Sequence, residues 1–250
     1  MIMKNFITGL QFLTRITIAK QSEWSPEGFV RSVNYFPLIG AIIGIILVGI
    51  NYLFSDYLPL MGIYLPPHVL TTLLIIANIV LAGGLHCDGF MDTMDGIYSG
   101  RSKEKMLEIM KDSRVGANGV MAFVLLVFLK WSLIMDISPL LLPNALLIMP
   151  VLGRFAMVIG ITIFPYARPE GIGKAFAQYT GKRTLFIALL FTLLFIVPLG
   201  KQAVVSLAVI CTFTLLFATY VKKIIGGLTG DIYGAICELA ELLVLLVFLL

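Results

Sequence analysis

Three aspartates lie close together in the stretch GGLHCDGFMDTMDG, directly after an apolar segment. Asp88, Asp92 and Asp95 are spaced by four and three residues, which places them within about 60° of each other on a helix. Acids on one helical face repel each other. Mg²⁺ relieves that repulsion because it binds carboxylate and phosphate oxygens together. We therefore predict that all three are Mg²⁺ ligands. The alternative, a solvated helix start, explains one acid but not three.

Basic residues follow the acids in the same polar segment. Residues 102–115 are predicted to form a short amphipathic helix that ends at Gly116, a favoured residue after a helix C-terminus. Arg101, Lys111 and Arg114 flank the acidic cluster. Cations next to a magnesium site neutralise the charge of a diphosphate, so we predict that these three contact a phosphorylated substrate. The alternative is that they are ordinary basic residues of a loop that faces the cytoplasm.

A second group of acids lies in the last segment, GGLTGDIYGAICELAELL. Asp231, Glu238 and Glu241 fall within about 80° on one helical face. Acids inside a membrane span are costly and face a polar interior or a partner. Arg154, in another apolar segment, needs such a partner, and both an acid of the last helix and a substrate phosphate are candidates. Gly227 permits close backbone approach to a ligand and is predicted to bind substrate.

The elements that position these residues are membrane-spanning helices. The chain has 250 residues, of which 59% are hydrophobic and 13% charged, and its mean hydropathy is +1.00, whereas soluble domains carry about 25% charged residues. We predict an all-α polytopic membrane helical bundle, a single domain over residues 1–250, with an interfacial helix over residues 2–18. Segments near the required length of about 20 residues number about seven: 33–54, 64–85, 119–137, 141–163, 184–200, 203–221 and 232–250.

The basic residues predict the orientation of the bundle. Segments 1–32, 86–118, 164–183 and 222–231 hold 15 of the 18 Lys and Arg residues, so they should face the cytoplasm. The protein is expected in the cell membrane with its active face cytoplasmic. The loop that carries Arg168 is rich in Pro and Gly and should cover this face, so Arg168 is predicted to bind substrate. The net charge of +4 reflects this bias, and no nucleic-acid partner is expected.

These motifs resemble the cobalamin synthase family, also called adenosylcobinamide-GDP ribazoletransferases. GGLHCDGFMDTMDG and LEIMKDSRVGANG look like the family signature, and NYFPLIGAIIG, GRFAMV, YARPEGIG and GGLTGDIYGAICELAEL fit it in order. The sequence departs from the family pattern at Cys87, Phe90 and Met91, and these departures concern packing and leave the acids of the motif unchanged. The resemblance implies a reaction in which a hydroxyl of α-ribazole, or of its 5′-phosphate, attacks the cobinamide-linked phosphorus of adenosylcobinamide-GDP. GMP leaves, and Mg²⁺ is the implied cofactor.

The resemblance also implies roles. Asp92 and Asp231 are expected to be catalytic, Asp231 as the base or as a further metal ligand. Arg114, Arg154 and Lys111 are expected to stabilise the departing GMP phosphate. The expected partners are the two substrates and the lipid bilayer, and the sequence leaves open whether the chain forms a homo-oligomer. The alternative function is another Mg²⁺-dependent membrane transferase that acts on a diphosphate-linked substrate. A transporter is disfavoured because its charges would gather near the midplane.

Overall fold

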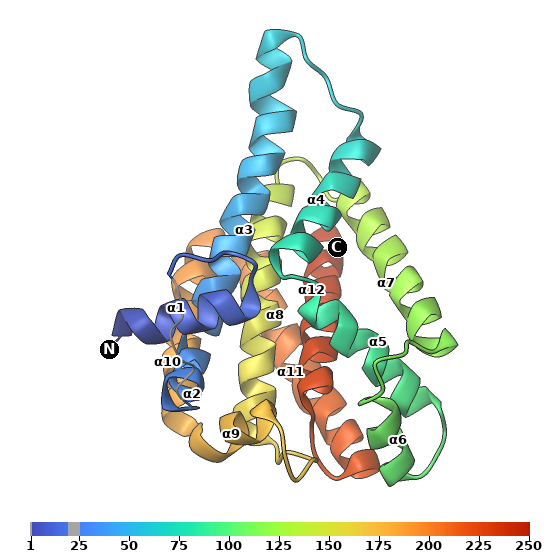
Figure 1. Ribbon diagram of the computed structural model, residues 1–250. Coiled ribbons are helices and arrows are strands. Elements are labelled where there is room, and N and C mark those ends of the chain that lie inside the picture. Colours follow the sequence, from blue (N-terminus) through green and yellow to red (C-terminus); the bar gives the residue numbers. More distant parts are fainter. Residues whose placement is uncertain (1, 20–25) are drawn as a thin grey trace.

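The protein is a bundle of helices (Figure 1), seen in a computed structural model that describes residues 2–19 and 26–250. Within these residues every regular element is helical, and strand-like pairing is limited to a parallel bridge between Tyr166 and Leu228. The predicted all-α class is confirmed. The α-helices are α1 (Ile2–Leu13), α2 (Pro26–Ser32), α3 (Phe36–Tyr52), α4 (Pro67–Leu81), α5 (Leu85–Tyr98), α6 (Lys103–Ile109), α7 (Ala117–Asp136), α8 (Leu142–Ile163), α9 (Ile172–Tyr179), α10 (Lys182–Ile196), α11 (Lys201–Ile225) and α12 (Gly230–Leu249).

Short 3₁₀ and π turns extend some of these helices. They are η1 (Val33–Tyr35), η2 (Leu53–Tyr57), η3 (Leu58–Met61) and η4 (Val197–Leu199). Among the described residues, 6 helical segments are long and apolar enough to cross a membrane, and the count becomes 7 if α4 and α5 form one broken span. This agrees with the predicted number. The span predicted over residues 64–85 is interrupted in the structure, because α4 ends at Leu81 and the chain then bends by 89° into α5.

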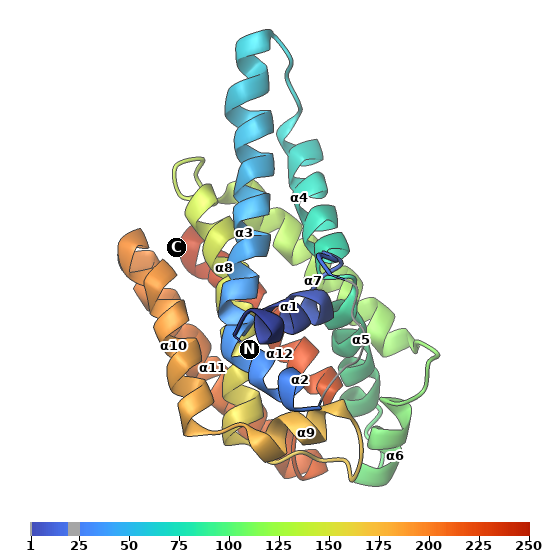
Figure 2. The same cartoon turned by 60° about the vertical axis from the view of Figure 1, so that its left-hand side comes forward.

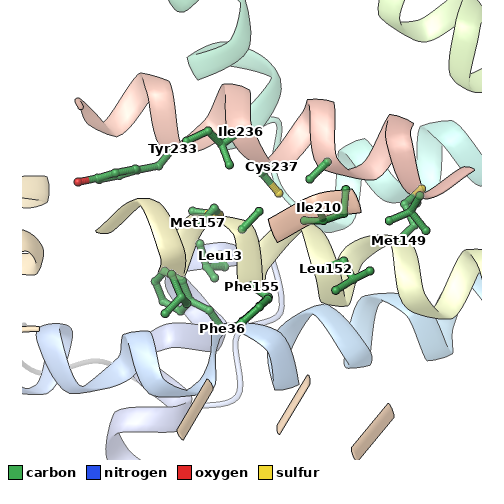
Figure 3. Packing of buried hydrophobic residues seen from close by; sticks show 14 of the residues in the cluster. Leu13, Phe36, Met149, Leu152, Phe155, Met157, Ile210, Tyr233, Ile236 and Cys237 are labelled. Atoms are coloured by element: carbon green, nitrogen blue, oxygen red, sulfur yellow. The ribbon is translucent and has the colours of Figure 1, made fainter. Parts of the chain in front are cut away.

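The core lies around α8 and α12. In the most apolar stretch of each helix, 83% of α8 and 67% of α12 is buried, against 17% of α10. Figure 3 shows side chains of α12, α8 and α3 packed in layers. Gly40 and Gly44 face α8, and a Cβ on Gly44 would lie 2.6 Å from the Leu147 carbonyl oxygen. These glycines therefore bring α3 and α8 into close contact, as small residues do in membrane bundles.

The N-terminal helix α1 lies across the bundle instead of along it (Figures 1 and 2). It has 12 residues, too few to span a bilayer, and its Leu10 and Leu13 are buried. At one end of the bundle α3 and α4 extend beyond the other helices, whereas α6 and α9 lie at the opposite end (Figure 2). The predicted amphipathic helix is shorter than expected, and Gly116 precedes α7 instead of closing α6.

Candidate active site

Helix α5, which carries the three aspartates, leaves α4 at a bend made by two glycines. Gly83 and Gly84 have φ values of 65° and 71°, in the left-handed region that side chains with a Cβ rarely adopt. Arg15 holds the bend: its N–H donates to the Leu81 carbonyl at 2.9 Å, and its guanidinium donates to the Gly83 carbonyl at 3.2 Å. The bend directs α5 away from the apolar α4 toward the end that carries α6 and α9 (Figure 1).

Two more glycines bring α5 into contact with α12. A Cβ on Gly89 would lie 2.9 Å from the backbone oxygen of Asp231, and a Cβ on Gly234 would lie 3.1 Å from that of His86. The two backbones therefore touch, and the start of α12 meets the acidic face of α5. As a result, Asp92 lies close enough to its neighbouring acids for their charges to interact, namely Asp88, Asp95 and Asp231.

Asp95 has a different environment from the other two aspartates of α5. It is buried, with 8% of its surface exposed, and its two carboxylate oxygens accept the backbone N–H groups of Gly116 at 2.7 Å and Gly119 at 2.8 Å. These donors belong to the first turn of α7, where N–H groups have no partner within the helix. Asp95, which belongs to α5, therefore caps the N-terminus of α7. A Cβ on Gly119 would lie 2.8 Å from the Met91 backbone oxygen, so glycine permits the close approach of α7 to α5.

Asp231 lies at the start of α12 and is paired with Arg168. The guanidinium Nη2 of Arg168 donates to Asp231 Oδ2 at 2.7 Å, and about a fifth of each side chain is exposed. The Thr229 hydroxyl donates to the same oxygen at 3.2 Å and accepts from the Ile232 N–H at 3.3 Å, which caps α12. Arg168 therefore joins the acidic cluster, which we define as Asp88, Asp92, Asp231 and Arg168.

The loop that carries Arg168 is held by backbone pairing with the segment before α12. The Ala167 N–H donates to the Leu228 carbonyl and the Leu228 N–H donates to the Pro165 carbonyl, both at 2.8 Å. A Cβ on Gly227 would lie 2.5 Å from the Pro165 oxygen. The close approach that Gly227 permits is therefore to this loop, and its predicted contact with substrate stays a prediction. In the same loop, burial raises the pKa of Tyr166.

The three basic residues around α6 lie outside the acidic cluster. Arg101, Lys111 and Arg114 are exposed, and in the described part of the chain none of them pairs with an acid of the cluster. Arg114 instead forms an exposed ion pair with Asp112 at 2.7 Å, and its hydrogen bonds lower the pKa of Asp112 to about 2. Their predicted contacts with a substrate phosphate therefore stay a prediction.

Arg154 is enclosed in the membrane-spanning part of the bundle. It is fully buried and forms an ion pair with Glu241, and its Nη2 lies 3.3 Å from His86 Nδ1. The expectation that an acid of the last helix partners Arg154 is confirmed. Because the guanidinium is buried in this pair, the structure does not bring Arg154 to the acidic cluster, and its predicted role at a phosphate stays untested.

A second cation, Lys130 of α7, completes a buried network with the same acids. Its Nζ lies 2.6 Å from Glu238 Oε2 and 2.8 Å from Glu241 Oε2. Asn78 of α4 donates to Glu241 at 2.9 Å. A charge inside an apolar span was the available signal for Lys130, because such a charge needs a partner, but sequence alone did not identify which one.

The donor set of the acidic cluster fits a magnesium ion shared with a phosphorylated ligand. Across residues 2–19 and 26–250, no three His, Cys, Asp or Glu side chains converge to form a complete metal site. The carboxylates of Asp88 and Asp92 accept no hydrogen bond from described residues, so their oxygens are available. Mg²⁺ commonly takes one or two protein carboxylates and completes its shell with water and phosphate oxygens.

Two hollows adjoin the acidic cluster. One, of ≈ 220 Å³, is lined by His86, Asp88, Asp231 and Tyr233 together with apolar side chains. The other, of ≈ 750 Å³, lies beside the α4–α5 bend and is lined by Arg15 and again by Asp88. Asp88 thus lines both spaces, and Asp231 lines the smaller one.

The fold and the site together define a class, polytopic membrane proteins with an acidic site at one end of the bundle. The comparison with known families then identifies the chain within that class. The family model described as "Cobalamin-5-phosphate synthase" matches residues 5–249. The chain belongs to this family.

Relatives match along nearly the whole chain. A protein of Desulfitobacterium hafniense (strain Y51) is 40% identical over 98% of this chain and 96% of its own length. A protein of Acetivibrio thermocellus is 38% identical over 99% of this chain and 98% of its own length. Both are named "Adenosylcobinamide-GDP ribazoletransferase". No solved structure matches the chain.

Proposed function

We propose that this chain is an adenosylcobinamide-GDP ribazoletransferase of cobalamin biosynthesis. A hydroxyl oxygen of α-ribazole, or of its 5′-phosphate, forms a bond to the cobinamide-linked phosphorus. The bond from that phosphorus to the GMP oxygen breaks, and GMP carries away the bonding electrons. The observation that carries the proposal is the meeting of Asp88, Asp92, Asp231 and Arg168 in a chain that matches the family over residues 5–249.

Magnesium is proposed as the cofactor, held by Asp88 and Asp92 with Asp95 behind them. When bound, it supplies positive charge to the diphosphate, which is the main requirement of phosphoryl transfer. Asp88 and Asp92 have available oxygens, whereas each oxygen of Asp95 already accepts a backbone N–H. Asp95 therefore contributes by positioning the other two or through its remaining lone pairs.

Arg168 and Asp231 are proposed to act as a pair. In the resting protein the Arg168 guanidinium neutralises Asp231. A diphosphate offers Arg168 a more highly charged partner with matching geometry, so substrate draws it away. Asp231 is then free to accept the proton of the attacking hydroxyl, at the cavity that both Asp231 and Asp88 line.

The exposed cations are proposed to receive the GMP phosphate. Arg114 lies two residues before Gly116, which Asp95 binds, so its loop is anchored near the acids. Lys111 lies in the same loop, and Arg101 lies at the other end of α6. We also propose that this end of the bundle faces the cytoplasm of the cell membrane, because it carries most of the basic residues.

The experiment is GMP release by the purified protein in lipid nanodiscs, with adenosylcobinamide-GDP, α-ribazole and Mg²⁺. We expect Asp92→Asn to lose about 100-fold or more of the rate, the range typical of a lost acid–base or charge-stabilising group. Asp56→Asn is the matched control, since Asp56 is exposed in η2, far from the site. Wild-type rate and Mg²⁺ dependence in Asp92→Asn would contradict the assignment.

A further inference from the structure

The ≈ 220 Å³ cavity beside the acidic cluster has an unusual lining. Its walls are mostly apolar and come from α1, α3, α8 and α9, with Phe12, Phe36, Met157 and Phe176 among them. Phe176 lies edge-on to Phe36, with ring centroids 6.1 Å apart. A water molecule needs only about 10–15 Å³ of such space. The cavity therefore admits a flat apolar group of many atoms.

Two residues of this lining, His86 and Tyr233, each have a buried polar atom without a partner among the described residues. His86 Nε2 and the Tyr233 hydroxyl are buried, and no described residue hydrogen-bonds to either. The two side chains are 1% and 3% exposed. Figure 3 shows the Tyr233 hydroxyl directed away from the packed residues Ile236 and Cys237. Buried polar groups of folded proteins have partners in the great majority of cases, so these two atoms point to a ligand.

The environment of His86 determines which hydrogen-bonding role its free nitrogen has. His86 Nδ1 faces the Arg154 guanidinium at 3.3 Å. A guanidinium only donates hydrogen bonds, so Nδ1 accepts. In a neutral imidazole the other nitrogen then carries the proton, which makes Nε2 a donor. Two residues of the cavity lining thus hold an N–H donor and a phenol hydroxyl that have no partner among the described residues.

We propose that this cavity binds the aromatic base of the incoming nucleoside, an inference that rests on the proposed function. The base it fits is flat and apolar and has a ring-nitrogen acceptor but no N–H donor, as in a benzimidazole nucleoside. Guanine does not fit, because its several N–H groups would face apolar walls without acceptors, a costly arrangement. The corrin macrocycle is far larger than the cavity.

The open end of the cavity places the rest of the nucleoside next to the acids. Asp88 is exposed and Asp231 is partly exposed, whereas Phe36, Met157 and Phe176 are buried. A base seated between the buried walls therefore directs its ribose toward Asp88 and Asp231. This puts the attacking hydroxyl beside the proposed base and metal ligands, so His86 and Tyr233 set the position and specificity of the acceptor substrate.

The test is a Tyr233→Phe variant in lipid nanodiscs, because removing an unpartnered hydroxyl breaks no contact of the fold. We expect the KM for α-ribazole to rise about 3- to 10-fold, as for one lost neutral hydrogen bond. The KM for adenosylcobinamide-GDP and the kcat should stay unchanged. Tyr98→Phe is the matched control, since Tyr98 is 71% exposed at the end of α5. An equal change in both KM values, or none, would overturn the proposal.

The base analogue 1-methylbenzimidazole, which keeps the acceptor nitrogen and has no N–H, gives an independent test that needs no turnover. Equilibrium dialysis should show one saturable site per wild-type chain, weakened in Tyr233→Phe and unchanged in Tyr98→Phe. In the assay, 1-methylbenzimidazole should compete with α-ribazole and not with adenosylcobinamide-GDP. Wild-type protein that releases GMP but does not bind 1-methylbenzimidazole would refute the base site alone. Wild-type protein that binds 1-methylbenzimidazole but releases no GMP would refute the proposed function alone.

Discussion

Asp231 and Glu238 are two turns apart on α12, yet they belong to two very different groups of charges. Glu238 faces Lys130 in a network whose side chains are no more than about 6% exposed. Asp231 faces Arg168 at a site where about a fifth of each side chain is exposed. The same helix therefore serves a closed polar core and an open acidic site.

The charge balance separates the two groups. The buried network pairs Lys130 and Arg154 with Glu238 and Glu241, so its formal charges cancel. Cancellation is required there, since an unpaired charge in a membrane core is costly. Its contacts join α7, α8 and α12, which makes it a structural element of the bundle.

The acidic cluster is unbalanced, with three aspartates and one arginine. Asp88 and Asp92 have no cation partner among the described residues, although the charges of Asp88, Asp95 and Asp231 all act on Asp92. Asp88 is exposed and Asp92 and Asp231 are partly exposed, and an excess of negative charge attracts cations. The two groups thus differ in both charge balance and exposure: the buried network is balanced and enclosed, and the acidic cluster, where we propose the chemistry takes place, is unbalanced and partly exposed.

Breaking the buried network should have the largest effect on stability. Glu241→Ala removes the acid shared by Lys130 and Arg154 and leaves two buried cations with one anion. We expect a loss of about 3–5 kcal/mol in the free energy of unfolding, measured by thermal unfolding in detergent. Glu104→Ala, at an exposed residue of α6, is the control. Equal unfolding temperatures for Glu241→Ala and wild type would mean that the network is not structural.

A substitution in the acidic cluster should change the response of the protein to Mg²⁺ and not its stability in the absence of Mg²⁺. Removing a repelling charge by Asp92→Asn should not lower the unfolding temperature in the absence of Mg²⁺. In wild type, Mg²⁺ at 100 times its Kd should add about 2.7 kcal/mol, and Asp92→Asn should lose most of that gain. The measurement is unfolding temperature against Mg²⁺ concentration, with Ca²⁺ for comparison. The same Mg²⁺ response in both proteins would remove Asp92 from the ligand set.

Asp95 tests a third role for an acid, which is to position the other aspartates of α5. Asp95→Asn keeps one acceptor oxygen but cannot accept both N–H groups of α7. We expect a loss of about 1–3 kcal/mol in stability and a smaller fall in GMP release than for Asp92→Asn. Thermal unfolding and the GMP assay measure the two effects. If Asp95→Asn instead lowered GMP release strongly with little loss of stability, and altered the Mg²⁺ requirement, Asp95 would be a direct Mg²⁺ ligand.

The exposed Asp112–Arg114 pair should have the smallest effect. Arg114 lowers the pKa of Asp112 to about 2, from an ordinary value near 3.9. Because the folded pKa is the lower one, the pair stabilises fully above pH 4 and loses its effect as the pH falls toward 2. Exposed pairs contribute little, so Asp112→Asn should match wild type in unfolding temperature at pH 7. A clear difference at pH 7 would show that the pair holds the loop.

Several features of this protein follow from local sequence. The length of an apolar run fixes whether a helix can cross a bilayer, which is why the predicted number of spans agrees with the fold. The spacing of Asp88, Asp92 and Asp95 sets their common helical face, and a charge such as Arg154 inside a span requires a partner wherever it lies. The family motifs are likewise a property of the sequence.

Other features depend on which helices meet, and no local rule determines that. The acids of the last segment were expected to share one face, but the packing of α12 divides them: Asp231 meets Arg168, whereas Glu238 and Glu241 meet Lys130. The span predicted over residues 64–85 is interrupted at Gly83 and Gly84, whose positive φ values are set by the folded chain.

The sequence by itself determined the membrane class, the family and the presence of an acidic face, because these depend on composition and spacing along one chain. Only the tertiary structure decided what each acid does. Asp95 caps α7, Asp231 pairs with Arg168 and Glu241 neutralises Arg154. These roles are set by contacts between residues far apart in the chain, and the close crossing of α5 and α12 at Gly89 and Gly234 brings Asp231 beside the acids of α5.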